Sequence, residues 1–269
     1  MKALIKLGGT LLDAPESRRQ IADQIARAFR DGLEAVVVHG GGKQMTRYLA
    51  DRGVESRFVN GLRVTTPDVL DAVLKVLAGS VNQELVAALV ASGASAVGLS
   101  GMDALLTEAR AISDELGLVG KPVRSDPRLL HTLMEFKYLP VIACVAGDRQ
   151  GRFYNVNADQ MAVSVASALG VDKLLFLTDV DGVRGPDNQI LPTLNLDQCR
   201  QLIDDGIATG GMRAKLDAAA EALDAGIDEV VIAPGATPGI LADLLAKRLS
   251  DHEPVGTRLV THLGVPRHA

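Results

Sequence analysis

The chain has 269 residues, a net charge of −5 and 47% hydrophobic residues, which suits a soluble globular protein with one large or two small domains. Aromatic residues make up only 3%, tryptophan is absent and no Lys/Arg run occurs, so we expect neither a nucleic-acid partner nor a membrane surface. The two cysteines and five histidines are scattered, which argues against a zinc site. Without an apolar run near roughly 20 residues or a signal-peptide layout, the expected location is cytoplasmic.

The first predicted strand, residues 4–7, is apolar on both faces but contains Lys6. An unpaired ammonium group is costly in a buried strand, so Lys6 either extends its stem toward solvent or meets an anion. Gly8 and Gly9 end the strand without side chains that would block a ligand. A lysine followed by bare backbone is therefore a candidate anion site.

A helix from Pro15 to Gly32, a strand at 35–38 and a helix through Ala50 follow. This β-α-β order predicts a parallel sheet with ligands at the carboxyl ends of its strands. The next predicted elements are a hairpin at 58–64, a helix at 67–92, a strand at 94–99, small strands within 104–124, a helix at 126–137, a strand at 140–145 and a helix ending at Leu169.

A second half repeats the pattern from Gly170. Its predicted elements are strands at 173–178, 229–233 and 257–260, helices at 196–205, 212–225 and 238–249, and a loose tail at 262–269. No long linker separates the halves, so we expect them to share one continuous sheet.

Three glycines, Gly40–Gly42, lie between a predicted buried strand and a helix. Neither common glycine motif fits, because Gly42-Lys43 is followed by Gln44, and Met45 occupies the last glycine position of the dinucleotide fingerprint. A tight turn needs one glycine and seldom three. The run therefore favours a loop whose N–H groups bind a carboxylate or a phosphate.

Four polar residues extend the candidate site. Arg63 follows an Asn-Gly turn and could bind a carboxylate through two hydrogen bonds, although an exposed surface arginine is the commoner interpretation. Asn155 and Asn157 are two residues apart on an extended segment and face the same side. Helix capping explains Asn157 and Asp159 but leaves Asn155 without a role, so a site is favoured.

The stretch after Gly210-Gly211 contains Lys215. If a helix begins at Met212, this lysine lies in the first turn, where a cation is unfavourable unless an anion binds there. Asp179 and Asp181 could hold a metal or orient a lysine, although an Asp-Gly turn accounts for Asp181.

These motifs in this order resemble the amino acid kinase family over residues 2–260. The residues that carry the resemblance are Lys6–Gly9, His39–Gly42, Asn60–Thr65, Asn155–Asp159, Thr178–Val180 and Gly210–Lys215. The segments at 60–65 and 155–159 are most similar to the branch that phosphorylates N-acetylglutamate. The resemblance implies an α/β fold, a three-layer αβα sandwich with a mainly parallel central sheet.

The implied reaction is ATP-dependent phosphorylation of the γ-carboxylate of N-acetyl-L-glutamate in arginine biosynthesis. Residues 1–170 would bind the acylated amino acid and dimerise, and residues 171–269 would bind ATP. Lys6 and Lys215 would stabilise the transferring phosphoryl group and Asp159 would orient them. The implied substrate residues are Gly41, Gly42, Arg63, Asn155 and Asn157, and the implied nucleotide residues are Gly8, Gly9, Thr178, Asp179, Val180, Asp181, Gly182, Ile207, Thr209 and Gly211.

The resemblance also implies Mg²⁺ carried by the nucleotide, with no direct protein ligand. Relatives inhibited by arginine carry a helix before the first strand and form hexamers, and only Met1 precedes the strand segment here. A homodimer insensitive to arginine is therefore expected. The sequence departs from the family at Met102-Asp103-Ala104, where Lys-Asp-Gly is usual. Two alternatives stay open: a kinase for acylated or carrier-bound aminoadipate, and a catalytically silent sensor of nucleotide or amino acid.

Overall fold

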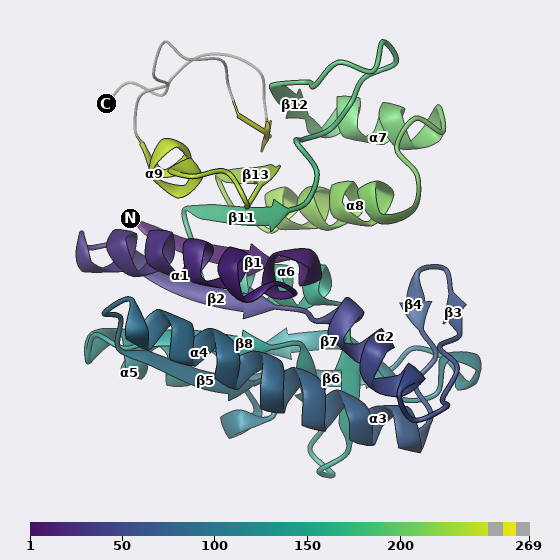
Figure 1. Ribbon diagram of the computed structural model, residues 1–269. Coiled ribbons are helices and arrows are strands. Elements are labelled where there is room, and N and C mark those ends of the chain that lie inside the picture. Colours follow the sequence, from purple (N-terminus) through teal and green to yellow (C-terminus); the bar gives the residue numbers. More distant parts are fainter. Residues whose placement is uncertain (247–254, 262–269) are drawn as a thin grey trace.

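The computed structural model describes residues 1–246 and 255–261 (Figure 1). Within these residues one eight-stranded sheet has the order β12-β14-β13-β11-β1-β2-β8-β5, and only β14 runs antiparallel to a neighbour, β13. The single, mainly parallel sheet predicted from the sequence is confirmed. The strands are β1 (Lys2–Leu7), β2 (Glu34–His39), β5 (Ala96–Ser100), β8 (Leu139–Ala143), β11 (Lys173–Thr178), β12 (Thr193–Asn195), β13 (Glu229–Pro234) and β14 (Thr257–Val260).

Helices cover both faces of the sheet, which makes the predicted αβα sandwich (Figure 1). One layer contains α1 (Pro15–Arg30), α4 (Asn82–Ala91) and α9 (Ile240–Leu245), with α2 (Gly42–Ala50) and α3 (Pro67–Val73) at its end. The other layer contains α5 (Arg128–Glu135), α6 (Ala158–Leu169), α8 (Gly210–Asp224) and α7 (Leu196–Asp204), which packs on α8.

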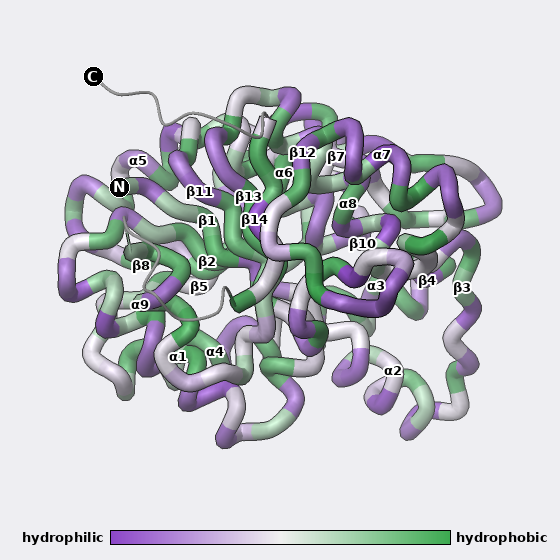
Figure 2. Tube along the Cα trace, turned by 90° about the horizontal axis from the view of Figure 1, so that it is seen from above, coloured by the Kyte–Doolittle hydropathy of each residue, from purple (hydrophilic) through white to green (hydrophobic). Residues whose placement is uncertain are grey.

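The central strands are nearly continuous runs of Val, Ile and Leu because both faces of the sheet are covered. Every residue of β1 from Ala3 to Leu7 is buried, and so is every residue of β2 from Ala35 to His39. Seen from above, these strands are mostly hydrophobic, whereas hydrophilic stretches lie on the surrounding loops and helices (Figure 2). Lys6 is thus a charged residue inside an apolar layer.

The direction in which strands are added reverses at β1. The N-terminal half extends the sheet from β1 through β2, β8 and β5, and the C-terminal half extends it the other way from β11. In open parallel sheets, ligands bind outside the carboxyl ends of the strands at such a reversal. The fold therefore places the ends of β1 and β11, which meet through the Gly8 N–H and the Leu177 carbonyl at 2.8 Å, at the expected binding crevice.

Two smaller β units lie beside the carboxyl ends. The hairpin β3 (Phe58–Val59) and β4 (Leu62–Arg63) turns at Asn60 and Gly61, both with positive φ, as the Asn-Gly signal predicts. The small strands predicted within 104–124 correspond to β6 and β7, which close a barrel with two further strands in the order β10-β7-β6-β9. Its members are β6 (Thr107–Ala111), β7 (Val119–Ser125), β9 (Val145–Gly147) and β10 (Phe153–Val156).

Several predicted boundaries were wrong. The strand expected at 140–145 is divided, because β8 ends at Ala143 and the chain then enters the barrel as β9. β12 was missed because it has three residues and pairs only with β14. The helix expected at 238–249 is seen as α9, Ile240–Leu245, and residues 247–249 lie outside the described part of the chain, as does the tail at 262–269.

The helix predicted from Pro67 is continuous to Ala91 but contains a π-helical segment, Leu74–Val81. By length and composition alone this helix could cross a membrane, contrary to the expectation that no stretch of the sequence could. A core helix of a soluble protein passes the same test. Here α4 packs against β5, β8 and α1, which is the packing of a core helix.

Candidate active site

Two lysines from opposite halves of the chain meet at one carboxylate. The Nζ of Lys6 lies 2.7 Å from Oδ1 of Asp159, and the Nζ of Lys215 lies 3.3 Å from Oδ2. Lys6 comes from β1, Asp159 from the first turn of α6 and Lys215 from α8. The side chains of Lys6 and Asp159 are only 7% and 8% exposed, so this cluster is largely shielded from water. The proximity of the two ammonium groups, expected from the sequence, is present.

The Asp159 carboxyl is ionised despite its burial. Burial by itself would raise its pKa, but the ammonium groups of Lys6 and Lys215 outweigh that effect and hold the pKa below its ordinary value. The side chain of Asn157 caps α6 by accepting hydrogen bonds from the N–H groups of Asp159 (2.9 Å) and Gln160 (3.2 Å). The cap fixes the start of α6 and with it the position of the Asp159 side chain, so one carboxylate can orient both lysines.

The helix that carries Lys215 begins earlier than predicted. α8 starts at Gly210, so Lys215 lies in the second turn and not in the first. Gly211, in the first turn, has open space where a Cβ would stand. This end of α8 thus carries no side chain at Gly210 or Gly211, and the N-terminus of a helix favours a bound anion.

A small cavity contains all five residues expected to bind the substrate. Its volume is about 170 Å³. The glycine run forms one wall, the β3/β4 hairpin a second and the start of α6 a third. The expected substrate residues that line it are Gly41, Gly42, Arg63, Asn155 and Asn157. A second cavity of about 530 Å³ adjoins it and shares Gly42, Phe58 and Arg63 with it.

Arg63 is buried, so its interpretation as an exposed surface arginine was wrong. Only 9% of it is exposed. Its guanidinium donates to the Gly42 carbonyl (3.1 Å), to Oγ1 of Thr46 (2.8 Å) and to Oγ of Ser56, and lies over the ring of Phe58. These bonds use three of five donors and leave two for a carboxylate in the cavity.

Asn155 is held by Thr65, a residue for which no role was predicted. Its amide nitrogen donates to Oγ1 of Thr65 (3.0 Å), and the Thr65 hydroxyl donates to the Arg63 carbonyl (2.8 Å). Thr65 is fully buried. Because the amide nitrogen of Asn155 is occupied, its carbonyl oxygen is left to accept a hydrogen bond from a ligand. The signal in the sequence was the position of Thr65 at the end of the Asn60–Thr65 motif.

His39, at the end of β2, is also buried and was missed. Its Nδ1 lies 2.8 Å from the Gly40 carbonyl and its Nε2 lies 2.9 Å from the amide nitrogen of Asn82. Burial lowers its pKa to about 4, against a smaller opposing effect of the Gly40 hydrogen bond. The imidazole is therefore neutral at physiological pH.

We expect protein stability to fall on acidification because of His39. Its folded-state pKa lies below its unfolded value of 6.5, so the unfolded chain binds more protons between pH 6.5 and about 4. The stabilisation is complete above pH 6.5 and is lost as the pH falls toward 4, a change of about 3 kcal/mol in the free energy of unfolding. Urea unfolding at a series of pH values measures it. The variant His39→Asn should be less stable at neutral pH and show a flatter profile in this window; an unchanged slope would contradict the assignment.

The structure brings only some of the expected nucleotide residues to the lysine pair. Gly8 lies against Thr178 at the β1/β11 junction, and the Thr178 hydroxyl donates to Asp179 (3.1 Å). Burial would raise the pKa of Asp179, but backbone and hydroxyl hydrogen bonds, Thr10 included, and the charge of Lys215 lower it. Asp179 is thus close to both halves of the site.

The other expected nucleotide residues lie farther along the C-terminal half. Val180 and Asp181 are exposed, and Asp181 pairs with Arg184 at 3.4 Å. Gly182 has φ +150° and packs against Thr257, so its backbone conformation and its packing explain why a glycine stands there. Ile207 is half-buried, Thr209 is exposed as the residue before α8, and Gly9 opens the short 3₁₀ helix at Gly9–Leu12.

The donor set fits a metal that arrives with a nucleotide. Among residues 1–246 and 255–261 no group of three His, Cys, Asp or Glu could hold a metal ion. Asp179 is an ionised carboxylate at the crevice, the kind of oxygen donor that Mg²⁺ accepts alongside phosphate oxygens.

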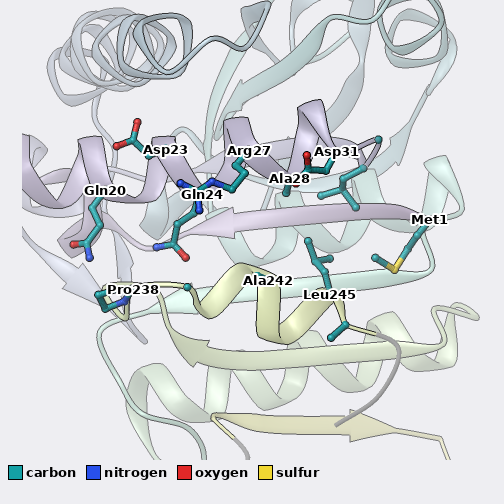
Figure 3. A pocket seen from close by; sticks show the side chains of 14 residues that line it. Met1, Gln20, Asp23, Gln24, Arg27, Ala28, Asp31, Pro238, Ala242 and Leu245 are labelled. Atoms are coloured by element: carbon teal, nitrogen blue, oxygen red, sulfur yellow. The ribbon is translucent and has the colours of Figure 1, made fainter. Parts of the chain in front are cut away.

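A further cavity lies away from these residues. Its volume is about 660 Å³, and it lies between α1 and α9 near Met1 (Figure 3). Gln24 spans the two helices by donating to the Thr237 carbonyl and accepting from the Leu241 N–H, both at 3.3 Å. None of the expected site residues lines it, and it has no glycine loop or lysine pair.

A sequence profile of the amino acid kinase family matches residues 1–234. The chain belongs to the amino acid kinase family. Acetylglutamate kinase from Solibacter usitatus is 61% identical to it over 261 residues, 97% of this chain and 100% of that protein. Acetylglutamate kinase from Acidobacterium capsulatum is 45% identical over 253 residues, 93% of this chain and 97% of that protein.

A solved structure has the same fold as this amino acid kinase. N-acetylglutamate synthase from Neisseria gonorrhoeae, in complex with coenzyme A and N-acetyl-glutamate, superimposes with a TM-score of 0.85 at 26% identity. The superposition covers 98% of this chain and 60% of the synthase, so this chain spans little more than half of that protein. The mainly parallel αβα fold agrees with family membership.

Local contacts hold the loop at Met102-Asp103-Ala104, the segment that is unusual in comparison with the resemblance described above. The Asp103 carboxylate accepts from the N–H (2.6 Å) and the hydroxyl (2.9 Å) of Ser100. Ala104 has φ +52°, a left-handed conformation that a glycine adopts without strain. Met102 packs over Gly147 of the barrel. No described contact joins this loop to the lysine pair.

Proposed function

We propose that this protein transfers the γ-phosphoryl group of ATP to the γ-carboxylate of N-acetyl-L-glutamate. The observation that carries the proposal is the buried cluster of Lys6, Asp159 and Lys215 beside a cavity with a glycine loop and a buried arginine. The near full-length similarity to proteins named acetylglutamate kinase supports this choice of substrate.

The reaction has an electrostatic difficulty that this site addresses. A carboxylate acceptor, with a pKa of about 4.3, is already ionised at neutral pH, so no general base is required. Two anionic reactants must approach, and negative charge concentrates as the phosphoryl group moves. The ammonium groups of Lys6 and Lys215 and the N–H groups of Gly41 and Gly42 would stabilise that charge. Mg²⁺ bound to the nucleotide phosphates would neutralise part of the charge.

The cavity offers complementary groups for the non-reacting end of the acylated amino acid. The two remaining donors of Arg63 suit its α-carboxylate, and the side-chain oxygen of Asn155 suits the N–H of its acyl amide. Asn157 would border the same ligand. The nucleotide would lie mainly on residues 171–269, along Thr178, Asp179 and the start of α8, with Gly8 and Gly9 of the N-terminal half beside it. The acylated amino acid would lie on residues 1–170.

A substrate panel tests the proposal. ADP release is measured with ATP and N-acetyl-L-glutamate, with N-acetyl-L-aminoadipate and with N-acetylglutamine as a control without an acceptor carboxylate. We expect turnover with the first and none with the control. A preference for the aminoadipate derivative would favour the alternative kinase, and binding of ATP without turnover of any acid would favour a sensor.

Arg63 provides a prediction about substrate affinity. In Arg63→Ala we expect KM for the acylated amino acid to rise about 10- to 100-fold, since a charged hydrogen-bonding partner of its carboxylate is lost. KM for ATP should change little, because Arg63 lines the cavities of the N-terminal half. Initial rates at varied concentrations of each substrate separate the effects. An equal rise in both KM values would contradict the assigned position.

We also propose a cytoplasmic homodimer. Two features support it: Cys144 and Cys199 are free and buried, as in a reducing compartment, and β5 is an edge strand of the described sheet. An open edge can pair with a second copy of the chain. Light scattering should give twice the mass of the chain; a monomer or a hexamer would refute the dimer.

A further inference from the structure

A buried polar pair stands directly behind the glycine loop. His39 ends β2 and is fully buried, and Asn82 begins α4 at the end of the π-helical segment and is 2% exposed. The amide nitrogen of Asn82 lies 2.9 Å from Nε2 of His39 and 3.0 Å from the Val141 carbonyl. Burying such a pair costs free energy unless every donor meets an acceptor. Its hydrogen bonds therefore show which atoms donate and which accept.

The contacts determine the tautomer of His39. The Val141 carbonyl can only accept, so the Asn82 atom that faces it is the amide nitrogen. The same nitrogen faces Nε2 of His39, which must then carry the lone pair. The proton is therefore on Nδ1, which donates to the Gly40 carbonyl at 2.8 Å.

This hydrogen bond fixes the direction of the next N–H group. In a planar trans peptide the C=O and the N–H point opposite ways. With the Gly40 carbonyl held toward the imidazole, the N–H of Gly41 points away from it. Within the described residues, neither this N–H nor that of Gly42 donates to another protein group, and both glycines line the substrate cavity.

The π-helical segment holds the loop from another side. A Cβ on Gly41 would lie 2.5 Å from Cδ2 of Leu77 and 3.4 Å from Cγ2 of Val81. π-Helical segments are rare and often occur at functional sites. This one places Leu77 against the loop and brings Asn82 to the imidazole.

We propose that Asn82 is a positioning residue for the acylated amino acid: through the neutral Nδ1–H form of His39, it holds the Gly40–Gly41 peptide with its N–H toward the acceptor carboxylate. The identity of the carboxylate rests on the proposed function. The orientation of the peptide does not, so the two can be tested separately.

The first test needs no variant and no ligand. The ¹⁵N NMR spectrum of the wild-type protein with labelled histidine should show, for His39, a protonated Nδ1 and an unprotonated Nε2 at neutral pH. A ring protonated on Nε2, or on both nitrogens, would overturn the proposal.

The second test uses Asn82→Leu, with Leu89→Ala as the control. Leu89 is buried on the same face of α4, two turns further on, so its loss weakens packing without touching His39. We expect Asn82→Leu alone to shift the amide resonance of Gly41 and to weaken binding of N-acetyl-L-glutamate about 10-fold by calorimetry, the scale of one hydrogen bond to a charged group. Binding of a non-hydrolysable ATP analogue should change less than about 2-fold in both variants.

The outcomes separate the two proposals. An unchanged Gly41 resonance in Asn82→Leu, or equal weakening in Leu89→Ala, would refute the positioning role. If the wild-type protein binds no acylated glutamate while the tautomer and the Gly41 shift appear as expected, the proposed substrate fails and the role of Asn82 in orienting the loop stands.

Discussion

Replacing Lys6 with methionine is expected to lower kcat by at least about 100- to 1,000-fold, the usual effect of removing one group that stabilises transition-state charge. Lys6 lies at the carboxyl end of the strand where the sheet reverses, and its ammonium group is buried beside Asp159. The same substitution at Lys215 should have a similar effect. Methionine retains the length and packing of the lysine stem, so the loss reports mainly on charge.

Single-turnover rates with saturating substrates measure this effect. Lys121→Met serves as a control, since Lys121 is exposed on β7 and its loss changes the net charge equally. Circular dichroism excludes a folding defect. If Lys6→Met and Lys215→Met both keep kcat within about 3-fold of wild type, neither lysine stabilises the transferring phosphoryl group.

The second large effect is expected in Asp159→Asn, and it has two parts. Removing the carboxylate leaves two ammonium groups close together in a buried site, which should lower the free energy of unfolding by about 3 kcal/mol or more. The lysines also lose their orientation, so kcat should fall about 100-fold. KM for ATP should not rise, because the site has become more positive.

Thermal unfolding with and without ATP distinguishes this account from simple damage. ATP supplies the anion that the variant lacks, so it should raise Tm more in Asp159→Asn than in the wild type. The wild-type contribution of Asp159, whose pKa lies below 3.8, is complete above that pH and is lost as the pH falls further. A raised KM for ATP with unchanged kcat would contradict the orienting role.

The sequence predicted most of the fold because its local signals agree with the tertiary structure. Apart from Lys6, the runs Leu4–Leu7 and Val36–Val38 are apolar because their strands are covered on both faces. The Asn60-Gly61 turn needs positive φ at both residues, which few other pairs allow. β12 has no such signal, since three residues carry no recognisable period.

The candidate site was predictable where its residues are unusual for the strand or turn that contains them. Lys6 inside an apolar strand and three glycines in succession have few structural explanations. The burial of Arg63 was not predictable from its neighbours, because Gly42, Thr46 and Ser56 reach it from other segments. The pair His39–Asn82 was missed for the same reason, since its members are 43 residues apart and each is ordinary in its own segment.

The central claim is that the two lysines bind the negative charge of the transition state more tightly than that of the reactants. Calorimetric affinity for MgADP with aluminium fluoride and N-acetyl-L-glutamate, a mimic of the transferring phosphoryl group, tests it most directly. We predict that Lys6→Met and Lys215→Met each weaken binding of the mimic by at least about 100-fold but binding of MgATP by less than about 10-fold. Equal weakening of both ligands would contradict the claim.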